Sequence, residues 1–179
     1  MLHGDSRHTV AFFTAWTMVS HEPADHRAEP NPLEGQKLVA ALPLDWSEVM
    51  IDGLTETGWD ETNDADMKRQ WVVDRQIAGD EFRNGLYGRA GRALQLVPGH
   101  APLTLKTSVQ SLKTGGLRPL ILTVRAQLLD PQGLVLDEIS IELKEGGGRF
   151  QWGLFRNRLS RAAHKAGTWV AEYFVERAE

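Results

Sequence analysis

The chain has 179 residues, which is enough for one domain of ordinary size with a single substantial core. Its 41% hydrophobic and 25% charged residues are typical of a globular protein rather than a disordered one. The net charge of -4 gives no overall attraction to nucleic acid or to an anionic membrane, and the lack of cysteine excludes disulfides, thiolate metal sites and cysteine nucleophiles.

An apolar run, VAFFTAWTMVS at 10–20, dominates the amino-terminal segment 1–20. It is shorter than the roughly 20 apolar residues that span a bilayer. Two interpretations stay open: a strand or short helix that packs on the domain, or a targeting segment, although no clear small-x-small cleavage site follows. Residues 21–34 are rich in proline and charge and are predicted to be a linker. The two histidines of this linker have the wrong spacing for a helical zinc site.

A single α/β domain is predicted for residues 35–179. Residues 36–44 have the pattern of a strand and 46–54 that of a short helix or turn, and the acidic residues that follow predict a solvated loop. Counted from Asp60, a twelve-residue calcium loop would need glycine and glutamate where Ala65 and Trp71 stand, so no calcium site is predicted.

Three tryptophans, Trp46, Trp59 and Trp71, surround this acidic region. Tryptophan is most often a core residue, and the alternative is that these three line a groove for a small molecule or lipid.

Asp80 can cap a helix over residues 80–96, where apolar residues recur with a period of 3.6; residues 67–77 fit a helix or a strand. Three glycines recur along this helix, Gly85, Gly88 and Gly91. Phosphate loops place their glycines before a helix, so we interpret these as positions of close packing on a sheet.

Three strands are predicted at 102–112, 119–129 and 134–143, because apolar and polar residues alternate along each of them. The turn from Asp130 to Gly133 has proline second and glycine fourth, which suits a type I turn. The strands should form an antiparallel meander with one apolar face, which acts as a scaffold. The predicted fold is therefore α+β: a mostly antiparallel sheet of about four or five strands with helices 80–96 and 153–177 packed on one face.

The last helix carries four basic residues, Arg156, Arg158, Arg161 and Lys165. They lack the interleaved exposed aromatics of a nucleic-acid surface, so we interpret them as a solvated helix face and a candidate surface for an acidic protein partner. His164 has no carboxylate at helical spacing and is assigned no role.

The runs LVPGHAPLTLKTSVQSLKTGG and LILTVRAQLLDPQGLVLDEISIEL, followed by a glycine-rich break and an amphipathic last helix, resemble small envelope lipoproteins of Gram-negative bacteria. These are mostly uncharacterised α/β domains in which a strand pair around a D-x-x-G turn follows a helix. The resemblance covers roughly residues 80–179. It implies a non-catalytic periplasmic accessory and supplies no catalytic residues. This chain departs from the group because it has no lipobox cysteine and its amino-terminal region is a poor signal peptide.

The sequence thus predicts a non-catalytic accessory or interaction protein of the bacterial cell envelope. Its location would be the periplasm or the inner face of the outer membrane, with the cytoplasm as the alternative. Its partner would be another envelope protein or a second copy, without nucleic acid, cofactor or metal, and any membrane contact would need an anchor. The alternative is a small-molecule or lipid-binding module. An enzyme is least expected, since none of the common catalytic motifs is present.

Overall fold

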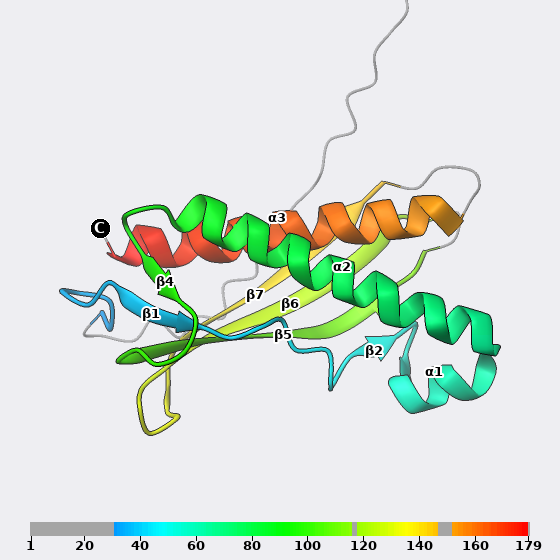
Figure 1. Ribbon diagram of the computed structural model, residues 1–179, viewed down its shortest axis with the longest axis horizontal. Coiled ribbons are helices and arrows are strands. Elements are labelled where there is room, and N and C mark those ends of the chain that lie inside the picture. The colour runs from blue at the N-terminus through cyan, green and yellow to red at the C-terminus, as the bar shows by residue number, and fades with distance from the viewer. Residues whose placement is uncertain (1–30, 116–117, 147–151, 179) are drawn as a thin grey trace, which may run out of the picture.

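The computed structural model describes residues 31–115, 118–146 and 152–178, so the predictions for residues 1–20 and for most of the 21–34 linker lie outside the described residues. The described chain forms two layers, in which two long helices lie side by side over one face of a sheet (Figure 1). In chain order, the elements are β1 (Leu38–Ala41), β2 (Met50–Ile51), β3 (Leu54–Thr55), α1 (Glu56–Thr62), α2 (Ala65–Ala90), β4 (Gln95–Val97), β5 (Leu103–Lys113), β6 (Leu120–Leu129), β7 (Val135–Glu145) and α3 (Trp152–Ala178).

The antiparallel meander predicted from the alternating residues is present as β5, β6 and β7. The sheet as a whole has seven strands, so the prediction of four or five was wrong in number. The sheet is also mixed, because three of its strand pairs are parallel. On its other side β5 pairs in parallel with β1 near its start and with β2 near its end, and β4 and β3 extend the sheet beyond them. Of these strands, β1 lies within the strand predicted at 36–44, whereas β2, β3 and β4 have only two or three residues, too few to show a period in the sequence.

The helix predicted from Asp80 begins fifteen residues earlier, at Ala65. Asp64 caps it by accepting hydrogen bonds from the backbone N–H groups of Asp66 and Met67. The acidic segment before it is also not a simple loop, because α1 occupies residues 56–62 with Thr55 as its cap. At the other end α2 stops at Ala90, and residues 95–97 form β4 instead of continuing the helix.

Two glycines let α2 and α3 pack unusually closely. A Cβ atom built on Gly85 would lie 2.1 Å from the carbonyl oxygen of His164, and one built on Gly167 would lie 2.0 Å from that of Phe82. The predicted close packing at Gly85 is thus present, but against α3 and not against the sheet. Gly88 is exposed with no atom within 4 Å of its Cβ position, and Gly91 follows the end of the helix with φ 56°.

The hydrophobic core lies between the helices and the inner face of the sheet. Phe82 of α2 and Phe174 of α3 are its largest fully buried side chains. Leu33, from the segment predicted as a linker, is also fully buried, and the nearby Asn31 side chain donates a hydrogen bond to the carbonyl of Arg177. The packed domain therefore includes the last residues of that segment.

Candidate functional site

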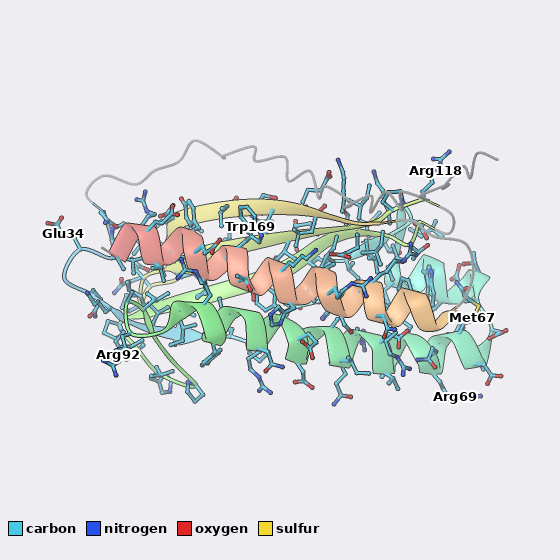
Figure 2. All side chains as sticks on the ribbon, turned by 90° about the horizontal axis from the view of Figure 1, so that it is seen from above. Glu34, Met67, Arg69, Arg92, Arg118 and Trp169 are labelled. Atoms are coloured by element: carbon cyan, nitrogen blue, oxygen red, sulfur yellow. The ribbon has the colours of Figure 1, made fainter. Side chains whose placement is uncertain are left out.

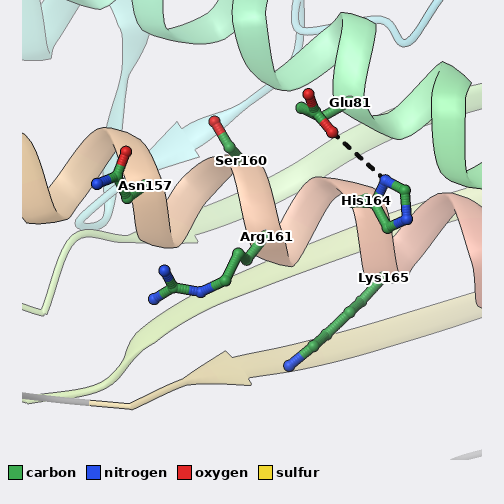
Figure 3. A pocket seen from close by; sticks show the side chains of 6 residues that line it. All are labelled: Glu81, Asn157, Ser160, Arg161, His164 and Lys165. Atoms are coloured by element: carbon green, nitrogen blue, oxygen red, sulfur yellow. Dashed lines mark ion pairs between the residues drawn. The ribbon is translucent and has the colours of Figure 1, made fainter.

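A depression of about 360 Å³ lies on the surface of α3 beside α2 (Figure 3). One residue comes from α2 and the others from successive turns of α3; they are Glu81, Asn157, Ser160, Arg161, His164 and Lys165. In Figure 3 Ser160 and His164 project toward α2, whereas Arg161 and Lys165 project toward the sheet. The depression therefore has a side facing α2 and a side facing β7.

On the β7 side, one buried carboxylate holds two cations. The side chain of Glu145, at the end of β7, is only 8% exposed. Arg161 Nε lies 3.3 Å from one of its oxygens and Lys165 Nζ lies 2.5 Å from the other. A buried carboxylate without a cation would be strongly destabilising, so Glu145 fixes both basic side chains over the strand.

On the α2 side, His164 Nδ1 lies 3.4 Å from an oxygen of Glu81. The sequence offered His164 no carboxylate at helical spacing because its partner belongs to the other helix. The two helices approach closely at Gly85 and Gly167, and this approach brings Glu81 within reach.

The other two predicted partner residues have structural contacts of their own. Arg156 Nε lies 2.7 Å from Asp74, a carboxylate of α2 that is 4% exposed. Arg158 is buried, and its guanidinium donates to the carbonyl oxygens of Thr114, Arg118 and Gly146. The prediction of one solvated basic face is therefore wrong for Arg158, because the end of the meander covers this side chain.

The three tryptophans of the predicted groove lie together in one aromatic cluster. The rings of Trp46 and Trp71 meet edge to face with centroids 5.5 Å apart, and Trp59 lies 6.0 Å from Trp71. Trp46 and Trp71 are buried in the core, and Trp59 packs against it. The indole N–H of Trp71 donates to Glu56, which also pairs with Arg75. These contacts are those of a core cluster that joins α1 and α2 to the rest of the domain.

A second buried ion pair between β7 and α3 was not predicted. Asp137, which is 1% exposed, pairs with Arg177 at 2.5 Å and accepts a hydrogen bond of 2.9 Å from the Tyr173 hydroxyl. The sequence contained a signal for it, since Asp137 and Glu145 both occupy inward-facing positions of an alternating strand. An acidic residue at such a position needs a cation from the layer above.

Among the described ionisable groups, Asp45, which precedes Trp46, has a pKa that clearly departs from its ordinary value. The backbone N–H of Ser47 donates to its carboxylate at 2.9 Å, and this bond, with a second from the Ser47 hydroxyl, lowers the pKa of Asp45. Asp45 lies outside the depression.

Two features are absent from the described residues, a metal-binding cluster and a membrane-spanning helix. The described residues contain no group of three or more histidine, aspartate or glutamate side chains placed to hold a metal ion. No helix in residues 31–115, 118–146 or 152–178 is long and apolar enough to cross a membrane.

No family model matches the chain, and no curated protein matches it either. Several solved structures do resemble it. An uncharacterised protein is 11% identical with a TM-score of 0.48, over 80% of this chain and 95% of that one. PelC from Paraburkholderia phytofirmans, crystallised as a dodecamer, is 16% identical with a TM-score of 0.38, over 86% and 95% of the two chains.

A Xanthomonas campestris protein of the DUF330 family is 10% identical with a TM-score of 0.39, and the match covers 46% of this chain. It spans only 52%, about half, of the length of the Xanthomonas protein. A candidate lipoprotein of Caulobacter crescentus is also among the matches. The structures similar to this chain thus include uncharacterised and lipoprotein-like proteins, at identities and scores that carry no function over to it.

Proposed function

We propose that this protein is a non-catalytic interaction protein of the bacterial cell envelope, and that the depression on α3 binds an acidic surface of another envelope protein. The observation that carries the proposal is the arrangement around Glu145, where one buried carboxylate holds two cations at the protein surface. On this side of the depression the positive charge exceeds the negative charge by one.

Arg161 is the residue best placed to contact the partner. Its side chain is 58% exposed, and its hydrogen bond to Glu145 uses only Nε. The two terminal nitrogens make no hydrogen bond to a described residue, so they can bind a carboxylate of a partner in the bidentate geometry that guanidinium favours. Because Glu145 already holds the side chain, less conformational entropy is lost when the partner binds.

The groups in the depression also favour recognition over catalysis. Glu145 is matched by the charges of Arg161 and Lys165, and Glu81 lies within 3.4 Å of His164, so each carboxylate has a nitrogen partner. Charged groups held in such pairs can complement the charges on the surface of a partner protein. The envelope location rests on the resemblance of residues 80–179 to envelope lipoproteins.

Binding of a small molecule is a second candidate function. The volume of the depression, about 360 Å³, falls at the lower end of the range of ligand sites. The contacts around the three tryptophans give that function no support, because their rings pack on one another.

The test compares Arg161→Gln with Arg83→Gln in cross-linking and affinity capture from envelope extracts. Arg83 is the control, because its side chain is 66% exposed on α2 and, like that of Arg161, pairs with a carboxylate, that of Asp80. Lys165 remains to neutralise Glu145 in the Arg161 variant, so the fold should persist, as circular dichroism can verify. We expect one partner to be lost selectively with Arg161→Gln and to be released by salt. Equal capture by both variants would contradict the proposal.

A further inference from the structure

Asparagine followed by glycine occurs once in the chain, at Asn84 and Gly85 in the second half of α2. In flexible peptides this is the asparagine sequence most prone to deamidation, because glycine has no side chain to hinder its backbone nitrogen. That nitrogen attacks Cγ of the asparagine, ammonia leaves, and a five-membered succinimide ring forms. Water then opens the ring at either carbonyl, which gives aspartate or isoaspartate. The reaction needs no enzyme, cofactor or oxidant.

The helix keeps Asn84 from reacting while the protein is folded. Asn84 is exposed, so water reaches its side chain. In an α-helix, however, each backbone N–H is directed at the carbonyl four residues earlier, which for Gly85 is that of Glu81. The succinimide ring also requires a ψ angle at Asn84 far from the helical value of about −42°. This turn of α2 must therefore open before the ring can close.

The neighbouring helix α3 opposes such an opening. The two helices lie side by side along most of their length (Figure 2). Gly85 is buried where they approach closely, and a Cβ atom built on it would lie 2.1 Å from the carbonyl oxygen of His164. One turn earlier, Phe82 is 1% exposed and belongs to the hydrophobic core. Opening this turn therefore requires the two helices to separate, which exposes the core and costs nearly as much free energy as unfolding the domain.

The isoaspartate product does not fit the folded structure. Its backbone continues through the former side chain, so one methylene group is added to the main chain at position 84. The residues of α2 after this position would then be out of register with those before it. At Gly85 the backbone of α3 leaves no room even for one added methyl group. The aspartate product keeps the normal backbone, and because residue 84 is exposed, it leaves the contact with α3 intact.

We propose that Asn84 is a deamidation site that the native fold protects and that makes prolonged unfolding irreversible. While α2 is packed on α3, the amide persists. Once the chain unfolds, Asn84 is converted through the succinimide to isoaspartate, and this form cannot repack α2 on α3. The modification therefore accumulates with the time spent unfolded, and molecules that carry isoaspartate do not return to the folded state. The inference goes beyond the proposed function, because it does not involve the binding of a partner.

Incubation of the full-length protein in denaturant at mildly alkaline pH, followed by refolding, tests the inference. Peptide mass spectrometry measures deamidation at Asn84, and near-ultraviolet circular dichroism of the tryptophans measures the fraction that refolds. We expect deamidation of the unfolded chain and a parallel loss of refolding. A native domain is unfolded for only about 10⁻³ to 10⁻⁶ of the time, so deamidation of the native protein should be slower by about 10³-fold or more.

Three variants separate the steps. Asn84→Gln should refold fully after the same incubation, because a glutamine side chain closes the corresponding ring far more slowly. Asn157→Gln is the matched control: Asn157 is also exposed on a helix, but Arg158 follows it, so the loss of refolding should equal that of the natural chain. Asn84→Asp, which carries the aspartate product from the start, should refold fully when it has not been incubated.

Repair of the damaged chain gives a second readout. A protein isoaspartate methyltransferase with its methyl donor converts isoaspartate back to aspartate, and this treatment should restore refolding. Equal rates of deamidation in the native and the unfolded protein would overturn the inference, and so would an isoaspartate form that refolds as well as the natural chain. The same loss of refolding in Asn84→Gln would also overturn it, because a process other than deamidation would then block refolding.

Discussion

Replacing Gly85 with alanine should destabilise the domain, although alanine is the better helix former. The added Cβ would lie 2.1 Å from the carbonyl oxygen of His164 and 3.1 Å from the backbone nitrogen of Thr168. An ordinary contact begins at 3.4 Å, so α2 and α3 would have to separate locally by about 1 Å. No side chain can rotate away, because the obstructing atoms belong to the backbone of α3.

Two opposing terms set the size of the effect. Alanine gains about 1 kcal/mol of helix propensity over glycine. Overpacking of a core costs about 1–3 kcal/mol, and a contact between two backbones calls for the upper end or beyond, because relief requires moving a whole helix. The net loss in the free energy of unfolding should therefore be about 2 kcal/mol. For a domain of this size, that corresponds to a fall in Tm of about 4–8 °C.

Gly88→Ala is the matched control, since it lies three residues further along the same helix. Its Cβ position has no atom within 4 Å and is exposed, so only the propensity gain applies and stability should rise by about 0.5–1 kcal/mol. Urea denaturation followed by circular dichroism measures both changes. If Gly85→Ala were as stabilising as Gly88→Ala, the close approach of α2 and α3 would be refuted.

Two further predictions concern polar groups. Arg158→Met should lower stability by about 3 kcal/mol or more in the same denaturation assay, because it leaves the carbonyls of Thr114, Arg118 and Gly146 without the donor that contacts them; a near-neutral result would mean that water replaces the guanidinium. Asp45 should titrate below the ordinary pKa of aspartate in a carboxyl NMR titration, because Ser47 donates to the charged form. Its depressed pKa contributes stability that is present above the unfolded pKa and is lost as the pH falls through the folded pKa; an ordinary midpoint would contradict the hydrogen bond.

The elements that were predicted well are those whose packing repeats along the chain. Strands β5, β6 and β7 alternate between buried and less buried residues along ten or eleven positions, and α3 has a continuous apolar stripe. The first half of α2 was ambiguous because Val72 and Val73 are exposed on it, so apolar residues do not mark its buried face. The strands β1 and β2 were missed as partners of β5, because their pairing depends on residues far along the chain.

The candidate site was only partly predictable for the same reason. Arg161 and Lys165 could be named from their spacing on one helix, but their shared partner Glu145 lies on β7. The contact of His164 with Glu81 likewise depends on how two helices cross. Spacing along one element can be read from a sequence, whereas a contact between elements requires the tertiary arrangement. An acidic residue at an inward strand position is the one sign of such a contact that the sequence offers.

The pairing of β5 has a consequence for the order in which the chain folds during its synthesis. Strand β1 at Leu38–Ala41 has its partners at Gln95–Val97 and Leu103–Leu105, so it leaves the ribosome well before either of them. The apolar face of the meander then waits for α3, the last element of the described chain. A nascent chain that stalls before α3 would expose that face, and such intermediates are prone to aggregate. Slow translation before residue 152 should therefore lower the yield of folded protein more than slow translation after it.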